Sequence, residues 1–194
     1  MSTPTLEERL AAAPDPVLRR LVASLGHVEG SRTYLEQLRW PEGVRCPRCD
    51  NASVLRIRTR RKYDCASCKY QFRVTAGTRL HDSHVPGWKW LAAIDVMMRS
   101  PVPVPATRLQ EILGGGYRTA WFLEHRIREA LVPPAGSERS TRAKHPRYAA
   151  AYWAEARWRA SAGTEAERFR NAALALLEAE PLGYRKLVSR PASA

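Results

Sequence analysis

Four cysteines arranged in two pairs constrain the fold of this chain more than any other feature of its sequence. Cys46 and Cys49 are separated by two residues, Cys65 and Cys68 are separated by two residues, and fifteen residues lie between the pairs. Each C-x-x-C turn aims two thiolates at one point, so two such turns supply the four tetrahedral ligands of a zinc site. Sulfur takes all four positions and leaves none for water or substrate, so we expect a structural zinc ion rather than a catalytic one.

Two alternatives to zinc are a pair of disulfides and four unrelated buried thiols. Disulfides belong to oxidising compartments, whereas the first residues of the chain contain acids and prolines and do not resemble a secretory signal. The paired spacing argues against unrelated thiols. We therefore expect metal-bound cysteines in a protein of the reducing cytoplasm.

The residues between and after the cysteine pairs predict short strands. Residues 54–57 are rich in Val, Leu and Ile, and residues 71–74 read as a further strand. Alternation with apolar neighbours would place Arg56, Arg58 and Arg60 on one face of the sheet. Residues 45–85 therefore predict a zinc ribbon, a sheet too small to fold without the metal as its core.

The predicted hairpin is strongly basic. Five of its seven residues from position 56 to position 62 carry positive charge, namely Arg56, Arg58, Arg60, Arg61 and Lys62. They are either an ordinary solvated surface or, because like charges repel, a surface that a phosphate backbone would neutralise. We expect these five residues to contact nucleic acid.

The charge of the whole chain also indicates a polyanionic partner. Its 194 residues include 32 Lys and Arg against 19 Asp and Glu, a net charge of +13, and its isoelectric point is near 10.3. DNA, RNA and an acidic membrane surface all fit this balance. No apolar run reaches the roughly 18 residues that a membrane span needs. Together with the expected DNA binding, this leads us to expect a cytoplasmic protein associated with the nucleoid.

Residues 86–132 predict three helices, at 88–98, 106–113 and 117–131, with a glycine turn before the third. A short helix, a turn and a longer basic helix outline a helix-turn-helix, whose last helix reads the major groove. Two alternatives are a plain three-helix domain and one in which Trp121 and Phe122 dock onto the ribbon. The predicted DNA-contacting residues of this helix are Arg118, Thr119, Phe122, His125 and Arg126, with Arg128 also placed for a phosphate.

The rest of the chain completes a fold that is mainly α with a small β zinc ribbon. Residues 1–44 predict N-terminal helices that brace the ribbon, with helices at about 15–26 and 32–40. Residues 133–145 read as a linker, and residues 146–194 as a helical hairpin with a capping box at Thr164 and Glu167. Because the hairpin is small, we expect it to pack on the rest of the chain, or to form a homodimer or bind a protein through residues 146–180.

Several stretches resemble bacterial insertion-sequence transposases of the ISXO type, which carry an N-terminal zinc ribbon. They are residues 38–49, 70–78, 86–88, 119–121 and 125–128, so the resemblance spans about residues 17–132. It implies zinc on the four cysteines and DNA reading by the helix at 117–131. One departure is Asp50, which stands where the family usually has glycine. Aspartate tolerates the backbone conformation that glycine adopts at such positions.

That family continues into a catalytic domain of ribonuclease-H-like fold, which we do not expect here. Residues 133–194 contain no aspartate, and their glutamates lie in alanine-rich helical sequence rather than in a cluster that could hold two metal ions. We therefore expect a non-enzymatic, sequence-specific double-stranded DNA-binding protein, a transposase-derived transcription regulator or DNA-site recogniser. The alternatives are a protein adaptor using the ribbon and the C-terminal hairpin, and a DNA-binding subunit of a transposition complex.

Overall fold

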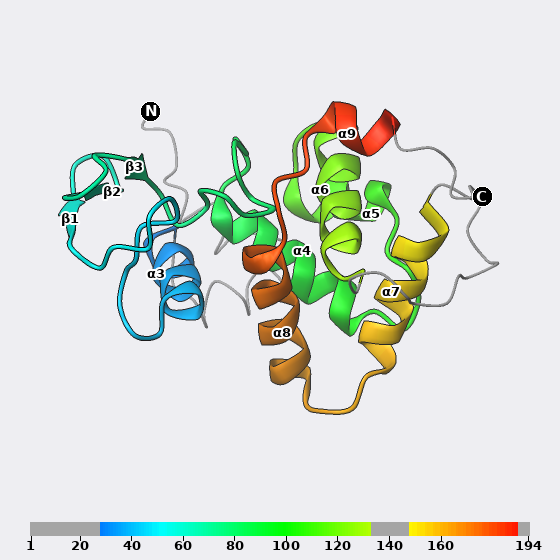
Figure 1. Cartoon of the computed structure of the whole chain (residues 1–194). Helices are drawn as coiled ribbons and strands as arrows, with labels where there is room; N and C mark the ends of the chain where they lie inside the picture. The colour runs from blue at the N-terminus through cyan, green and yellow to red at the C-terminus, as the bar shows by residue number, and fades with distance from the viewer. Residues whose placement is uncertain (1–27, 133–147, 190–194) are drawn as a thin grey trace, which may run out of the picture.

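The structure is a computed structural model of the chain and describes residues 28–132 and 148–189. A zinc-ribbon-like sheet lies at one side of the molecule and a body of packed helices at the other, with α3 between them (Figure 1). The elements, in chain order, are α3 (Val28–Arg39), β1 (Val54–Ile57), β2 (Lys62–Cys65), β3 (Gln71–Phe72), α4 (Gly87–Arg99), α5 (Ala106–Leu113), α6 (Tyr117–Ala130), α7 (Ala149–Ala160), α8 (Glu165–Glu178) and α9 (Tyr184–Ser189).

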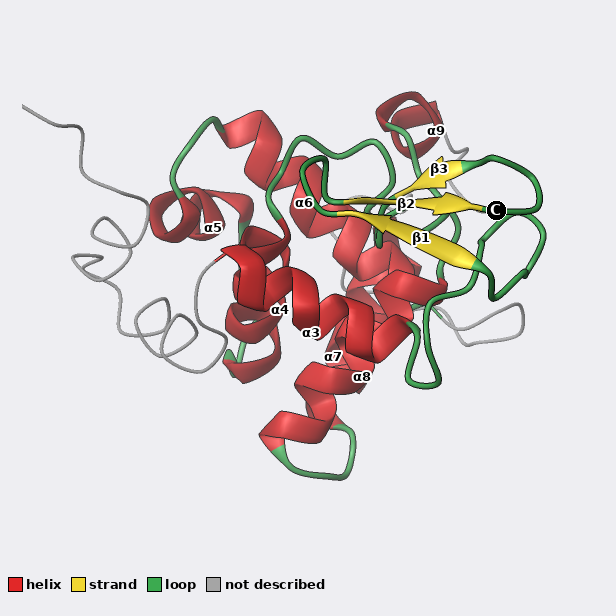
Figure 2. Ribbon diagram, turned by 90° about the vertical axis from the view of Figure 1, so that its left-hand side faces the viewer, coloured by secondary structure: helices red, strands yellow, loops and turns green. Residues whose placement is uncertain are grey.

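The sheet has three antiparallel strands in the order β1-β2-β3 (Figure 2). Tyr63 on β2 pairs in register with Phe72 on β3, and their rings stack at 5.6 Å. Trp40, just after α3, meets both rings edge-on at 5.7 and 6.0 Å. This aromatic cluster forms a small core together with Cys46, Cys65 and Cys68, as expected for a ribbon that cannot bury much surface.

The basic hairpin is shorter than its sequence predicts. Strand β1 ends at Ile57, which pairs with Lys62, and residues 58–61 form the turn between the strands. Arg61 holds this turn with a left-handed backbone at φ 51°, and its amide donates to the carbonyl oxygen of Arg58 at 3.2 Å. The prediction that Arg56, Arg58 and Arg60 share one strand face is therefore wrong, because only Arg56 is in the strand.

Helix α3, predicted at about residues 32–40, runs from Val28 to Arg39 and contacts the helical body and the segment that follows β3. Its Leu35 is buried in the core of the helical body, while Arg39, its last residue, donates to the carbonyl oxygen of Val74 at 2.5 Å. Tyr34 stacks on Phe169 of α8 with ring centroids 6.0 Å apart. The helix thus ties the ribbon to the body, and the other predicted N-terminal helix, near residues 15–26, lies outside the described residues.

The helices of the body pack around α4, in which ten of thirteen residues are buried. The hydrophobic core runs without a break from α3 through α4, α5 and α6 to α7 and α8. The bounds predicted for α4, α5 and α6 are confirmed to within one residue at each end. Among the described residues, no helix is long and apolar enough to cross a membrane.

The predicted C-terminal hairpin is present as α7 and α8, and it packs on the rest of the chain. The capping box is confirmed, since the Thr164 side chain accepts from the amide of Glu167 and the Glu167 side chain accepts from the amide of Thr164. Helix α8 lies against α4 and α3, and α7 lies against α6. The predicted linker and the start of the hairpin at Pro146 lie outside the described residues.

Candidate metal centre and cationic surface

The four cysteines converge on one point at the end of the ribbon. Their sulfur atoms all lie within 4.8 Å of one another, and the Cys46–Cys68 and Cys49–Cys65 sulfur pairs are each 3.6 Å apart. Among the described residues, no other cluster of three or more His, Cys, Asp or Glu side chains has this property. The separation suits four ligands around one ion, so the predicted zinc-binding set is confirmed.

Two turns of the same form build this centre. In the first turn the amide of Asp50 donates to the carbonyl oxygen of Cys46 at 2.9 Å, and in the second the amide of Lys69 donates to that of Cys65 at 3.0 Å. Asp50 and Lys69 both have a left-handed backbone, at φ 54° and 56°. The residue after each cysteine pair must therefore adopt this conformation, which explains why Asp can replace glycine at position 50.

The donor set fits a structural zinc ion. Backbone amides of Cys68 and Ser67 lower the pKa of the Cys65 thiol to about 7, which favours the thiolate at this one ligand, whereas the pKa of the Cys49 thiol is raised to about 12 among its uncharged neighbours. Cys46 and Cys65 are buried, so bound metal would form part of the ribbon core. When bound there, zinc would clamp the two turns together and supply folding free energy rather than chemistry.

The predicted basic surface is exposed at the other end of the β1–β2 hairpin, since Cys65 pairs with Val54 and the turn follows the Ile57–Lys62 pair. Arg56, Arg58, Arg60 and Arg61 are exposed, and Lys62 is half-buried. All lie on β1, on the turn that follows it, or on the first residue of β2. The metal-clamped sheet therefore displays four guanidinium groups at one end of the molecule.

Helix α6 has a different environment from the one predicted for a groove-reading helix. It is nearly enclosed from Ala120 to Glu129, where only Trp121 and Phe122 retain partial exposure. Arg118 and Thr119, in its first turn, are exposed as predicted. Because a recognition helix must present several side chains to the base edges along one face, α6 offers DNA only its N-terminal end.

His125 is buried, which contradicts its prediction as a DNA contact. Its side chain is enclosed by the rings of Trp121, Tyr148 and Tyr152 at 4.2, 4.5 and 6.1 Å. Burial, reinforced by the nearby charge of Arg128, lowers the pKa of His125 to about 4. The imidazole is thus neutral and forms part of an aromatic core between α6 and α7.

Arg126 is likewise a buried structural residue rather than a phosphate contact. Its guanidinium donates to the carbonyl oxygen of Arg79 and, at 3.3 Å, to that of His81. It also lies over the rings of Trp90 and Phe122 at 5.2 and 5.0 Å. Burial lowers its pKa to about 10, so it stays charged at neutral pH and holds the loop after the ribbon against α6.

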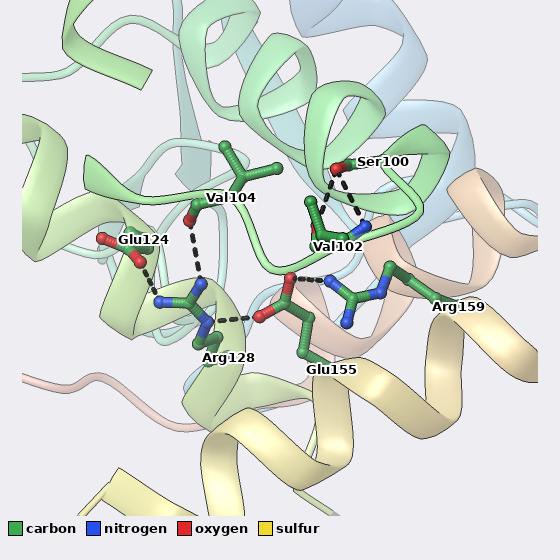
Figure 3. Close-up of polar contacts among 7 residues, drawn as sticks. All are labelled: Ser100, Val102, Val104, Glu124, Arg128, Glu155 and Arg159. Atoms are coloured by element: carbon green, nitrogen blue, oxygen red, sulfur yellow. Dashed lines mark hydrogen bonds and ion pairs between the residues drawn. The ribbon is translucent and has the colours of Figure 1, made fainter. Parts of the chain in front are cut away.

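Arg128, the other predicted phosphate contact, is the centre of a buried ion-pair network (Figure 3). Its guanidinium donates to the carboxylates of Glu124 and Glu155 and to the carbonyl oxygen of Val104 at 2.9 Å. Arg159 binds the second oxygen of Glu155 at 2.7 Å. The network joins α6, α7 and the α4–α5 connection, so this side of α6 is sealed by the protein itself.

The short helix α9 covers part of the remaining face of α6, and the sequence patterns do not reveal it. The Tyr184 ring meets the rings of Phe122 and Trp121 at 5.9 and 6.3 Å, and the Arg118 guanidinium lies over it at 4.5 Å. Trp121 and Phe122 therefore dock on α7 and α9, not on the ribbon. A six-residue segment gives almost no periodicity, and the only signals are the preceding Pro181 and Gly183.

A wide groove of about 1150 Å³ lies between α7, α8 and the end of α6. Its lining is mostly small and apolar, with Ala154, Ala175 and Ala179 beside Leu131 and Trp158. The Trp158 indole donates to the carbonyl oxygen of Leu131 at 3.1 Å, which fixes one wall. The expected homodimer or protein partner of residues 146–180 stays a prediction.

Comparison with known proteins finds similarity mainly in the ribbon region. Residues 29–71 match the family described as the transposase zinc-ribbon domain, of the IS1595 type. This region of the chain is transposase-related. The matched residues include α3, the four cysteines and the whole basic turn, and they stop before the helical body.

A relative from Halobacterium salinarum extends the similarity. It is described as an uncharacterized protein in transposable element ISH50, and it is 31% identical over 103 residues, which are 52% of this chain and 34% of that protein. The chain thus covers about a third of the length of this relative. No solved structure matches. The ISXO assignment and the expected lack of a catalytic domain stay predictions.

Proposed function

We propose that the protein binds double-stranded DNA through the basic turn of its zinc ribbon, and that it does so without catalysing a reaction on the DNA. One observation carries this proposal. The four exposed arginines at positions 56, 58, 60 and 61 are displayed on a sheet whose shape is set by a metal site. The match of this same segment to a transposase zinc ribbon supports it.

The physical basis is counterion release. DNA carries a dense line of phosphate charge, and each cation that neutralises a phosphate frees a condensed counterion and contributes affinity. Guanidinium groups suit this role because their N–H groups match phosphate oxygens two at a time. A turn held by strand pairing and by its own backbone hydrogen bond loses little conformational entropy on binding, so more of this interaction energy becomes affinity.

A second, smaller contact is proposed at the N-terminal end of α6. Arg118 and Thr119 are exposed there, and Arg185 and Lys186 on the adjacent α9 are exposed as well. These residues suit phosphate contacts rather than base reading, because α6 presents only one turn. We accordingly propose a transposase-derived regulator or site recogniser of the nucleoid, whose affinity comes mainly from the DNA backbone.

The experiment is a salt series on the zinc-loaded protein with a fluorescent duplex. The proposal predicts a linear fall of log K with log salt concentration, with a slope of about −0.9 for every phosphate neutralised. Removing the zinc with a chelator should abolish the binding, and restoring zinc should recover it. The proposal is overturned if the binding constant does not change with salt concentration, or if it is the same with and without zinc.

A DNA-binding subunit of a transposition complex is the second candidate. The chain matches a transposase zinc ribbon and about a third of a protein found in a transposable element, which favours it. The two candidates differ in their need for a partner. Strand transfer with magnesium, seen only when a catalytic protein is added to this one, would support the second; binding and gene regulation without any partner would support the first.

A further inference from the structure

The arginines of the basic turn form a hollow together with the start of α3. Five side chains line this hollow, which has a volume of about 410 Å³: Glu29, Arg32, Arg56, Arg58 and Arg61. Two of them belong to α3 and three to the β1–β2 hairpin. We call this site the arginine hollow, and its lining places it where the β1–β2 hairpin meets α3.

One carboxylate sits among the four guanidinium groups of the arginine hollow. Arg32 binds Glu29 closely, with its Nε donating to Oε1 at 3.1 Å. The guanidinium groups of Arg56 and Arg61 approach the same carboxylate at 3.9 and 3.7 Å. The hydrogen bond from Arg32, aided by the charges of Arg61 and Arg56, lowers the pKa of Glu29, so this group is negatively charged at neutral pH.

The two hairpin arginines are held less tightly than Arg32. Arg32 also binds Glu36 one turn further along α3, and only 13% of its side chain is exposed. Arg56 and Arg61 have 50% and 61% of their side chains exposed and stand beyond hydrogen-bonding distance of Glu29. Arg32 is thus fixed by two carboxylates, whereas Arg56 and Arg61 are free to take a better acceptor.

The charge balance of the arginine hollow favours the binding of a further anion. The four guanidinium groups of this concave site face two carboxylates, Glu29 and Glu36, which both bind Arg32, so a surplus of two positive charges remains. A phosphodiester offers two anionic oxygens of tetrahedral geometry, which several guanidinium groups can bind at once. Glu29 and Glu36 are already engaged by Arg32, so they leave N–H groups of Arg56 and Arg61 without a close acceptor in this site.

We propose that the arginine hollow seats one backbone phosphate of duplex DNA, and that Glu29 is its internal competitor in the free protein. This inference rests on the proposed DNA binding by the ribbon. On binding, Arg56 and Arg61 turn from Glu29 to the phosphate, and Glu29 stays paired with Arg32. Glu29 then lowers the affinity for every duplex and makes release faster than it would be from an all-arginine site.

The first test compares two changes that remove the same charge. Glu29→Gln takes away the competitor, and Glu42→Gln removes a carboxylate from an exposed turn outside the hollow. In duplex titrations at low salt, E29Q should tighten binding about two- to fivefold, the usual strength of an exposed ion pair. E42Q should have a clearly smaller effect, because it changes only the net charge.

The second test asks whether the gain depends on the arginine hollow. Arg61→Ala removes a lining guanidinium, while Arg60→Ala removes one from the same exposed turn that does not line the hollow. The tightening produced by E29Q should be clearly smaller in the R61A background, where only Arg56 remains to be released, and should persist in full in the R60A background. This difference is the pairwise coupling that a double-mutant cycle isolates. Zinc content measured on each variant confirms that the ribbon is intact.

The outcomes separate this inference from the proposed function. If wild-type protein binds duplex DNA with the expected salt dependence but E29Q equals E42Q in every background, the phosphate seat is wrong and the DNA-binding proposal stands. If wild-type protein shows no salt-dependent duplex binding, the proposed function is wrong, and the inference that rests on it is wrong as well. If E29Q tightens duplex binding, and if this gain depends on Arg61 but not on Arg60, the arginine hollow is established as the phosphate site.

Discussion

Arg128 on α6 and Glu155 on α7 form an ion pair whose two side chains are completely enclosed by the protein. Glu124 binds the same guanidinium from one turn back on α6, and the Tyr152 ring lies 4.0 Å from it. A charge enclosed in this way is tolerated only while its partners are present. The pair therefore links α7 to α6, and this side of the predicted DNA-reading helix is enclosed by the protein itself.

Replacing Arg128 should destabilise the protein severely. Arg128→Met keeps the bulk of the side chain but leaves the Glu124 and Glu155 carboxylates buried without their main partner, at a cost of about 3–5 kcal/mol in the free energy of unfolding. Urea unfolding followed by circular dichroism measures it. Arg108→Met is the matched control, because its exposed pair with Glu111 is worth less than about 1 kcal/mol. Equal losses in both variants would contradict the buried network.

The stability of the helical body should fall in mild acid because of His125. The unfolded chain binds a proton at this residue with a pKa near 6.5, whereas the folded protein does so only at about 4. Protonation therefore favours the unfolded chain, so the contribution of His125 is complete above about pH 6.5 and is lost as the pH falls towards 4. At 1.36 kcal/mol for each pKa unit, the loss is at most about 3 kcal/mol.

His125→Phe isolates this effect, because phenylalanine fills the same aromatic site and carries no proton. Unfolding free energies of H125F and wild type should diverge progressively between pH 6.5 and 4, with the variant less sensitive to acid. Loss of zinc in acid is common to both proteins and cancels in the difference. Parallel pH profiles would show that His125 has the same pKa in the folded and the unfolded protein, in conflict with its burial.

Loss of one cysteine ligand should unfold the ribbon and spare the helical body. Cys65→Ser removes a fully buried sulfur, so the chain should lose its single zinc ion and the ordered packing of Tyr63 and Phe72. The helical body keeps its own continuous core, so most of the helical circular dichroism signal should persist. Metal analysis and near-ultraviolet spectra check this, and Ser67→Ala within the same turn should retain one zinc ion for each chain.

The parts of this structure that were predictable from sequence are those set by short-range spacing. The cysteine pairs predict the metal centre because two residues between cysteines fix the turn geometry by themselves. Thr164 and Glu167 predict the start of α8 because a capping box is satisfied within one turn. Helices α4, α5 and α6 follow from apolar periodicity and from the prolines and glycines between them.

The parts that were not predictable depend on which surfaces meet. The pattern of α6 reads as amphipathic, because His125, Arg126 and Arg128 count as polar residues in a periodicity argument. Their burial depends on partners far along the chain, such as Glu155 and Tyr148, that no local pattern links to them. The arginine hollow is similar: Glu29 and Arg32 look like an ordinary helix-surface pair until Arg56 and Arg61 are brought beside them.

The central claim, that the ribbon rather than α6 grips DNA, is tested most directly by two charge reversals in one duplex titration. Arg58→Glu changes the ribbon turn and Arg118→Glu changes the exposed end of α6, and both alter the net charge by the same amount. We expect R58E to lose most of the affinity and to flatten the salt dependence, with R118E causing a much smaller loss. A protein that tolerates R58E and loses its DNA binding with R118E would contradict the claim.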